Sequence, residues 1–418
     1  MIATKQSRAP VHGMTVAGVF SGIGGFELGF EKEGFESRFL CELDADACAV
    51  LESQFGGIAI HKDVTTLRRL PRADVITAGF PCQDLSAVGT REGISGSKSN
   101  LIRVLLGLVE KSVSKPTWLV LENVPFMLQL ERGRAMEEIT SALEDLGYCW
   151  AYRVVDTRAF GLPQRRRRVI LVACRGNAKP EDVLLCEDAV APAPPNRKDL
   201  ARGFYWTEGN RGIGWAIDAI PTLKGGSSIS IPSPPAIWKP EDGSIRLPDI
   251  RDAERLQGFK ANWTLATQAL SPRHERRRWK QVGNAVSVPV AKWIAHRIAN
   301  PGMFDPALAS VHQPGGAWPL AAYGKKGARF SARVSEWPLN RATPHLHTFL
   351  KYAGMPISNR AATGFFERVR RSTLKLEDGF LEALALAAGL HPGRAIRIIP
   401  QSSNSTPSKR MRRPKLQS

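Results

Sequence analysis

The chain has 418 residues, of which 58 are Lys or Arg and 39 are Asp or Glu, so its formal net charge is +19. Hydrophobic residues make up 43%, which excludes a wholly disordered chain, and no apolar run approaches the ~18 residues of a membrane-spanning helix. The length predicts two or three domains. The six cysteines form no C-x-x-C pair, which argues against zinc ribbons, iron–sulfur sites and disulfide scaffolds. We expect a soluble, cytoplasmic protein.

The positive charge is concentrated toward the C-terminus. Residues 301–418 contain 18 Lys or Arg and 6 Asp or Glu, a net charge of +12, whereas residues 1–300 carry only +7. Such a distribution favours a polyanionic partner, most simply nucleic acid, because phosphates attract clustered cations. The alternative is a solvated basic tail without a partner.

The first half of the chain alternates short apolar runs with helical patterns. This alternation predicts an α/β fold with a parallel sheet covered on both faces, and ligands bound outside the carboxyl ends of its strands. The predicted strands are Arg38 to Glu42, Val75 to Thr77, Trp118 to Glu122, Tyr152 to Val155 and Val169 to Cys174. The predicted helices are Asp44 to Gln54, Leu101 to Lys111 and Arg134 to Leu146.

The pattern changes after Arg175. Residues 176–245 are rich in Gly, Pro and Ser and predict a smaller domain of short strands and loops. Helical patterns return at Asp252 to Phe259 and at Val288 to Ile298, and the basic last residues, 401–418, predict disorder.

A glycine turn follows the first apolar run, at Phe20-Ser21-Gly22-Ile23-Gly24-Gly25. Glycines let a ligand approach the backbone closely. Glu42 ends the next predicted strand about 20 residues on, where a carboxylate can bind ribose hydroxyls, and Asp63 follows a third short segment. The pattern favours a nucleoside without phosphates. The alternative is an ordinary strand–helix turn.

Two further strands end in reactive residue types. Cys82, in Gly79-Phe80-Pro81-Cys82-Gln83, lies where a thiolate could act as a nucleophile, although a buried structural cysteine is the alternative. Glu122 ends the next strand at the same edge. A carboxylate in an apolar setting can donate a proton, and a surface charge or helix cap is the alternative.

Four consecutive arginines, Arg165 to Arg168, enter the last strong strand. Because alternate side chains of a strand face the same way, Arg166 and Arg168 are expected to share one side and to bind an anion or a polarised base there. The alternative is a phosphate-binding patch.

Taken together, these segments resemble the bacterial DNA (cytosine-5) methyltransferases. Six motifs occur in the order and at the spacing of that family, across residues 15–300: VFSGIGG, GFPCQDLS, LENV, GLPQRRRRV, RDAERLQGF and QVGNAV. The resemblance implies a Rossmann-like, S-adenosylmethionine-dependent methyltransferase sheet, with a smaller target-recognition domain and a C-terminal extension.

The resemblance also implies roles for the matching residues. Cys82 would attack carbon 6 of a flipped cytosine, Glu122 would contact its ring nitrogen 3 and amine, and Arg166 and Arg168 would position the base. The residues implied for the S-adenosylmethionine site are Phe20, Gly22, Gly24, Glu42, Asp63, Pro81, Asn284 and Val286.

The implied domain organisation follows the motifs. Residues 1–175, completed by 280–300, would form the catalytic domain, and residues 176–279 the target-recognition domain. Residues 301–400 would form an extension of unassigned role, followed by a disordered basic tail at 401–418. We expect a chain ending near Pro301 to keep methyl transfer and to bind DNA more weakly. The alternative is that the extension packs on the catalytic domain as structural support.

The implied partners are S-adenosylmethionine and double-stranded DNA, with no metal and no membrane. A monomer is expected, and a cognate restriction endonuclease would be the usual companion. The sequence departs from the family at Gly18-Val19-Phe20, where Asp-Leu-Phe is usual, which affects the methionine end of the cofactor site. It also departs at Leu85, where an aromatic is usual. A tRNA cytosine methyltransferase and an inactive DNA-binding paralogue are the alternatives, and a nicotinamide dehydrogenase does not fit the glycine pattern.

Overall fold

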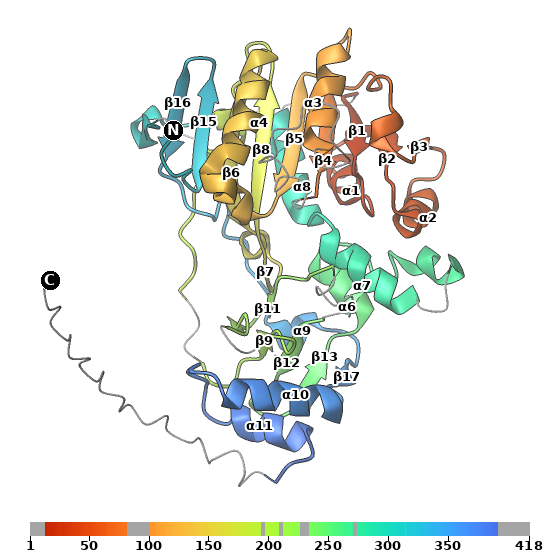
Figure 1. Cartoon of the computed structure of the whole chain (residues 1–418), viewed down its shortest axis with the longest axis vertical. Helices are drawn as coiled ribbons and strands as arrows, with labels where there is room; N and C mark the ends of the chain where they lie inside the picture. The colour runs from red at the N-terminus through yellow and green to blue at the C-terminus, as the bar shows by residue number, and fades with distance from the viewer. Residues whose placement is uncertain are drawn as a thin grey trace, which may run out of the picture.

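The larger lobe is built on a ten-stranded sheet (Figure 1). The computed structural model describes residues 13–81, 101–193, 197–208, 212–225, 234–270, 274–313 and 315–391. The strand order is β14-β16-β15-β6-β8-β5-β4-β1-β2-β3. From one edge to the other, the strands are Ala309–Val311, Ala328–Ala332, Ala321–Lys325, Cys149–Asp156, Arg167–Cys174, Trp118–Asn123, Val75–Gly79, Thr15–Val19, Glu36–Cys41 and Ile60–His61.

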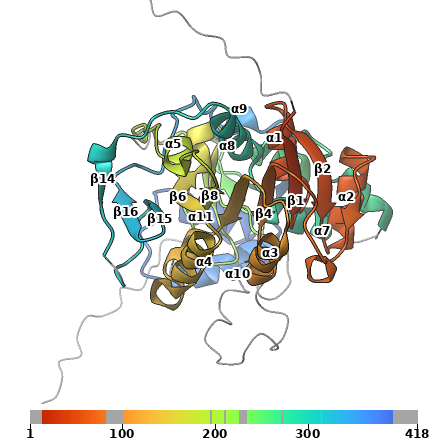
Figure 2. The ribbon, with the colours of Figure 1, turned by 90° about the horizontal axis from the view of Figure 1, so that it is seen from above.

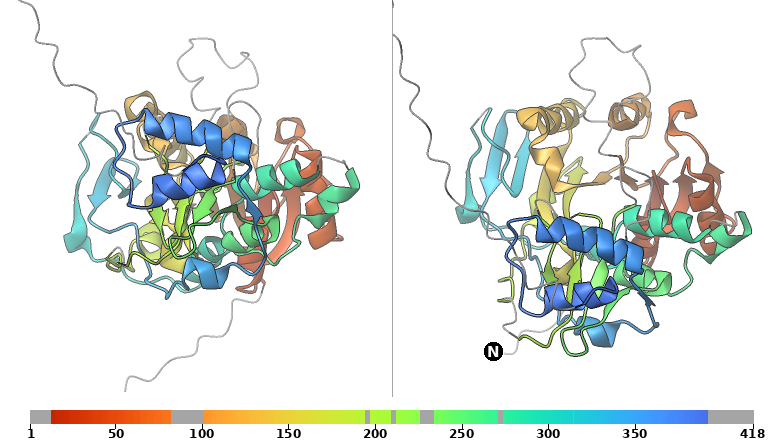
Figure 3. Two further views of the ribbon diagram at one scale, coloured as in Figure 1. Left: turned by 90° about the horizontal axis from the view of Figure 1, so that it is seen from below. Right: turned by 60° about the horizontal axis from the view of Figure 1, so that its bottom comes forward.

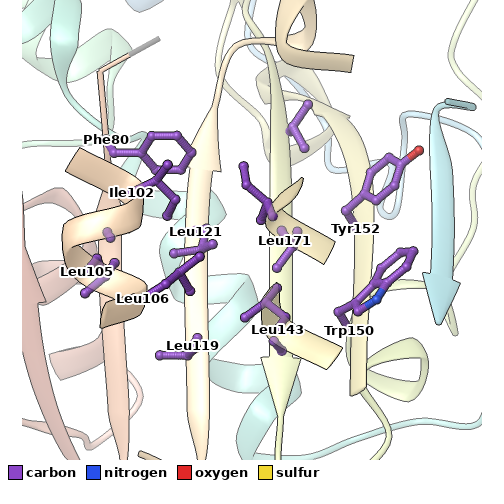
Figure 4. Close-up of a cluster of buried hydrophobic side chains, with 14 of the residues drawn as sticks. Phe80, Ile102, Leu105, Leu106, Leu119, Leu121, Leu143, Trp150, Tyr152 and Leu171 are labelled. Atoms are coloured by element: carbon purple, nitrogen blue, oxygen red, sulfur yellow. The ribbon is translucent and has the colours of Figure 1, made fainter. Parts of the chain in front are cut away.

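Helices cover both faces of this sheet, as the view from above shows (Figure 2). One face carries α3 (Leu101–Lys111) and α4 (Arg134–Asp145), and the other carries α1 (Gly25–Glu31), α5 (Pro180–Leu184) and α8 (Val288–Ala299). Leucines of α3 and α4 pack against Leu119, Leu121 and Leu171 of the central strands (Figure 4). The expected helix over Leu101 to Lys111 is confirmed, because its apolar positions recur with helical spacing.

The expectation of a parallel sheet is confirmed for β1 to β5 and is wrong for the strands beyond β5. Strands β1 to β5 pair in parallel, but β8 runs antiparallel to both β5 and β6, and β15 runs antiparallel to β6. The connection from β6 to β8, residues 157–166, holds only the short 3₁₀ helix η5 (Thr157–Phe160) and the two-residue strand β7 (Gln164–Arg165). It is too short for the helical crossover that a parallel neighbour requires.

The smaller lobe is built on a five-stranded sheet in the order β10-β9-β12-β13-β17, all antiparallel. Its strands are Ala216–Ile217, Arg202–Phe204, Ala236–Trp238, Ile245–Leu247 and Met355–Pro356. Its helices are α6 (Ile250–Leu256), α7 (His274–Asn284), α9 (Leu346–Phe349), α10 (Asn359–Arg370) and α11 (Phe380–Ala387). A two-residue strand, β11 (Ile220–Pro221), pairs in parallel with β7 and so joins the two lobes.

The residues after Pro301 contribute to both lobes. Strands β14, β15 and β16 form one edge of the large sheet, and β17 adds the last strand to the small one. Helices α10 and α11 pack on the small sheet (Figure 3), with Phe365 and Phe380 against Phe204 at ring-centroid distances of 5.4 and 5.0 Å. This packing does not fit the expectation that a chain ending near Pro301 keeps methyl transfer. It fits the alternative, in which the extension packs on the rest of the protein as structural support.

The boundary expected at residue 175 also differs from the packing. Helix α5 (Pro180–Leu184) buries Val183 and Leu184 in the core of the large lobe, beside Ile294 of α8. The remaining 3₁₀ helices are η1 (Val64–Thr66), η3 (Pro125–Leu128), η4 (Leu130–Gly133), η6 (Leu265–Leu270) and η7 (Pro306–Leu308). Within the described ranges, no helix has the length and apolar character that crossing a bilayer requires.

Candidate active site

Strands β4 and β5 bring two of the sequence motifs to the same edge of the sheet. Gly79 at the end of β4 pairs in register with Glu122 on β5. The next residue, Asn123, donates its Nδ2 hydrogen to the carbonyl oxygen of Phe80 over 3.1 Å and is buried. Cys82 lies outside the described residues; the residue before it, Pro81, is described and is exposed. The segment leading to Cys82 is therefore fixed beside Glu122 by the side chain of Asn123.

Glu122 forms a buried ion pair with Arg168. The Nε of Arg168 lies 2.8 Å from Oε1 of Glu122, and the two side chains are 15% and 9% exposed. Strand β8 runs antiparallel to β5, so its first residues lie beside the last residues of β5. This reversed direction brings an arginine from the start of one strand to a glutamate at the end of another.

The environment of this pair is mainly apolar. Burial lowers the pKa of Arg168, and the negative charge of Glu122 opposes that shift. A pocket beside the pair is lined by Glu122, Val155, Thr157, Arg168, Ile170, Val286, Ser287 and Val290. Glu122 is thus not the isolated carboxylate that the sequence pattern suggested, since it has a fixed cationic partner.

Arg166 lies near Arg168 but makes different contacts. Its Nη1 donates to the carbonyl oxygens of Leu223 and Gly283, at 3.0 and 3.2 Å, and its Nη2 donates to that of Ala285 at 2.7 Å. The side chain is 1% exposed, and burial lowers its pKa well below the ordinary value. These bonds connect the arginine motif to the small lobe and to the segment between α7 and α8.

The first glycine turn and Glu42 form a second group at the ends of β1 and β2. The carboxylate of Glu42 accepts hydrogen bonds from the backbone N–H groups of Gly22 and Asp44, each at 2.8 Å. Phe20 and Gly22 both have φ values of +57°, and Gly24 has a φ of +82° at the start of α1. The left-handed backbone turns the loop sharply over the end of β1.

Three other residues expected at the cofactor site, Asp63, Val286 and Asn284, lie in different parts of the structure. Asp63 caps the 3₁₀ helix η1, because its carboxylate accepts a hydrogen bond from the Thr65 N–H. It follows β3 directly, and the carbonyl oxygen of His61 in β3 accepts a hydrogen bond from the Glu42 N–H. Val286 lies between Gly25 and Gly79, so it connects α1 with the end of β4. Asn284 is exposed and lies against Gly225 of the small lobe.

Two glutamines between the lobes have functions that their motifs did not make evident. Gln164 is fully buried; it donates to the Leu256 carbonyl oxygen at 2.7 Å and accepts from the Leu223 N–H at 3.1 Å. Gln257 donates to the Val282 carbonyl oxygen and accepts from the Ser287 hydroxyl. Both residues lie in motifs quoted above, GLPQRRRRV and RDAERLQGF, but these motifs are rich in charged residues, so no signal in the sequence separated the buried glutamines from their polar neighbours.

Comparison with known proteins places this geometry in a family. The family model described as C-5 cytosine-specific DNA methylase matches residues 14–202 and 198–300. The chain is 44% identical over 384 residues to the Type II methyltransferase M2.BsuMI of Bacillus subtilis (strain 168), covering 89% of this chain and 97% of that protein. The chain belongs to the C-5 cytosine-specific DNA methylase family. Its motifs and its fold agree with that assignment.

Other relatives of this methylase are more distant. The Type II methyltransferase M.BsuFI of Bacillus subtilis is 29% identical over 304 residues, covering 68% of the methylase and 71% of that protein. Among solved structures, the S. pombe Dnmt2 methyltransferase is similar with a TM-score of 0.52 and 17% identity, covering 69% of this chain and 98% of that one. The latter likeness supports the fold only. The match to M2.BsuMI extends past residue 300, so that relative shares C-terminal sequence with this methylase.

Proposed function

We propose that this methylase transfers a methyl group from S-adenosylmethionine to carbon 5 of a cytosine that has left the DNA duplex, with Cys82 as the nucleophile. The observation that carries the proposal is the buried Glu122–Arg168 ion pair beside the segment that leads to Cys82. The base must leave the helical stack because neither groove gives access to both faces of the ring.

The residues around the glycine turn fit a nucleoside cofactor. Glu42 is held by two backbone N–H groups, and its oxygens keep further lone pairs that can accept ribose hydroxyls. Phe20 offers an aromatic ring at the same turn, and Asp63 lies at the end of the neighbouring strand. We assign these residues, with Gly22, Gly24, Pro81, Asn284 and Val286, to the S-adenosylmethionine site. When bound there, S-adenosylmethionine supplies an electrophilic methyl group.

The protein's own part in the reaction is to make carbon 5 nucleophilic. The thiolate of Cys82 adds to carbon 6, while Glu122 holds ring nitrogen 3 and the exocyclic amine. Arg168 fixes the Glu122 carboxylate in place through the ion pair. After carbon 5 has gained the methyl group, its proton leaves to water, the sulfur–carbon bond breaks, and the Cys82 thiolate returns. Arg166 supports this site through its bonds to three backbone carbonyls.

The small lobe is the proposed reader of the DNA sequence. Residues 176–279 carry the loops and the exposed basic side chains, such as Arg197 and Lys198, that are suited to base-edge contacts. The relatives named above are Type II methyltransferases. We therefore infer that the methylase acts in the cytoplasm, as a monomer, as the modification partner of a restriction endonuclease.

Bisulfite sequencing of DNA from cells that express the protein tests the proposal directly. We expect protected cytosines within one short sequence for the native protein and none for Cys82→Ala. Duplex DNA containing 5-fluorocytosine should form a covalent complex with the native protein, because fluorine cannot leave as the proton does. Methylation by Cys82→Ala would refute the proposed role of this residue.

A further inference from the structure

A buried carboxyl group lies beneath the first glycine turn. Glu27, on α1, is 1% exposed, and neither of its carboxylate oxygens has a hydrogen-bond partner among the described residues. The hydroxyl of Ser21, in the turn itself, is also buried, and it is close enough to the carboxyl group to lower the pKa of Glu27 in part. A buried charge without a partner is unfavourable, so this arrangement calls for a function.

The carboxyl group fills the space at the end of β1 that the side chain of residue 18 would occupy. A Cβ atom built on Gly18 would lie 1.8 Å from Oε1 of Glu27 and 2.6 Å from the Oγ of Ser21. Gly18 is the position at which the sequence departs from the aspartate usual in the family. In this chain, therefore, a carboxylate reaches the end of β1 from the helix rather than from the strand.

No positive charge among the described residues is positioned to compensate Glu27. The nearby charges on its own helix and at the end of β2, Glu31 and Glu42, are both negative. On α8, which packs against α1, Lys292 and His296 are directed to Glu33 at 3.6 and 2.9 Å. Burial raises the pKa of Glu27 to about 7; nearby backbone and Ser21 hydrogen-bond donors offset this only in part, and the two glutamates reinforce it.

We propose that Glu27 supplies the negative charge that faces the α-ammonium group of the cofactor's methionine end. The inference rests on the proposed function, because it needs S-adenosylmethionine at the glycine turn. The nucleoside end of that cofactor is neutral and suits Glu42, whereas the methionine end carries the ammonium cation. A cation bound beside the turn removes the unfavourable energy of the unpaired carboxylate, so part of the binding energy comes from Glu27.

Calorimetric binding of two ligands to the full-length protein tests the proposal. S-adenosylhomocysteine keeps the ammonium group but has no sulfonium charge, and 5′-methylthioadenosine lacks the amino-acid end. For the native protein, we expect the affinity for S-adenosylhomocysteine to be about tenfold weaker at pH 6 than at pH 8, since Glu27 must be ionised to bind the ammonium. The affinity for 5′-methylthioadenosine should stay constant.

Glu27→Gln should bind S-adenosylhomocysteine at least tenfold more weakly than the native protein at pH 8, without the change between pH 6 and 8. The matched control is Glu31→Gln, which removes an exposed carboxylate one turn along the same helix and should bind S-adenosylhomocysteine at pH 8 as tightly as the native protein. In Glu27→Ala, the additional change Gly18→Asp should restore affinity, because it returns a carboxylate to the same space from β1. If the Glu27→Gln protein folds poorly, this double variant still tests whether a carboxylate in that space binds the ammonium group.

Three other results would contradict either the role of Glu27 or the proposed cofactor. Equal affinity of Glu27→Gln and the native protein for S-adenosylhomocysteine would overturn the role of Glu27 and leave the proposed function intact. A parallel loss of 5′-methylthioadenosine binding would overturn it too, by showing that Glu27 only supports the turn. Failure of the native protein to bind either ligand would instead refute the proposed cofactor.

Discussion

At the scale of single residues, the active site depends on charges that are buried in pairs. Arg168 and Glu122 are each largely removed from water, and the two opposite charges lie in contact. Their fixed geometry suits the proposed function, in which the carboxylate contacts ring nitrogen 3 of the cytosine. Arg166, two residues earlier, is more deeply buried, and its two terminal nitrogens donate to backbone carbonyl oxygens.

Replacing Glu122 with Gln should therefore reduce methyl transfer strongly while leaving cofactor binding intact. We expect a loss of about 10²- to 10⁴-fold in the single-turnover rate, which is the usual contribution of a positioned acid or base. The matched control is Glu336→Gln, because Glu336 pairs with Arg167, the residue next to Arg168, at the surface. A Glu122→Gln protein with the native rate would contradict the proposed role.

Glu27 should make the stability of the ligand-free protein depend on pH. Its pKa rises from 4.5 to about 7 on folding, so the folded state holds the proton more tightly between these values. Stability consequently falls as pH rises through this range, and the full cost, about 3 kcal/mol, is present above pH 7. Urea denaturation should show Glu27→Gln gaining about 2 to 3 kcal/mol over the native protein between pH 5 and pH 8. A constant difference would show that Glu27 does not titrate there.

At the scale of elements, the sequence predicted the central strands and helices well but not their directions. Runs such as Trp118 to Glu122 are apolar throughout because both faces of the strand are covered, and this is visible in the sequence. Strand direction depends on the connection, and the ten residues between β6 and β8 were a signal for an antiparallel pair that the alternating pattern obscured.

The candidate site was predictable to a similar extent. The motifs identified Glu122 and Arg168, since their residue types carry the chemistry. They could not reveal that Arg166 binds Leu223 and Ala285, because these contacts join segments more than 50 residues apart. Glu27 was missed for the same reason: its significance depends on the space left by Gly18, which only the folded chain shows.

Arg368 on helix α10 is expected to influence DNA recognition. Arg368 donates to the carbonyl oxygens of Trp206 and Glu208, at 2.7 and 3.0 Å, and so fixes a segment of the small lobe next to β9. Arg368→Ala should reduce discrimination between the methylated sequence and single-mismatch sites by about tenfold, since one mismatch is worth about 1–3 kcal/mol. The control is Arg370→Ala, which removes an exposed arginine paired with Glu367 on the same helix.

Bisulfite sequencing of a pooled duplex library measures this discrimination, with S-adenosylhomocysteine affinity as the check on folding. Unchanged discrimination in Arg368→Ala would show that the helix has no influence on site choice.

At the scale of the whole molecule, the C-terminal residues complete both lobes. A chain ending at Pro301 would uncover β6 at the edge of the large sheet and the aromatic rings of Phe204 and Trp238 in the small one. We expect that chain to be insoluble or inactive. A soluble and active chain ending at Pro301 would contradict the packing described above.

A chain ending at His391 should instead remain folded and active. Residues 392–418 contain seven Lys or Arg and no Asp or Glu, so their removal tests DNA binding by charge alone. If these residues bind phosphates, the slope of log affinity against log salt should become shallower by roughly 0.9 for each phosphate that they neutralise in the full-length protein. An identical slope would show that this segment does not touch DNA.

The division of the C-terminal residues between two sheets has a consequence for synthesis on the ribosome. All six motifs emerge within the first 300 residues, but the small sheet gains its last strand only when Met355 and Pro356 have been made. Domains usually fold as they emerge, from the N-terminus onward. Here neither lobe can be completed in that order, so a nascent chain that already carries all six motifs still lacks the strands between residues 309 and 356. Methylation by a newly made molecule should begin only after the residues up to His391 have left the ribosome.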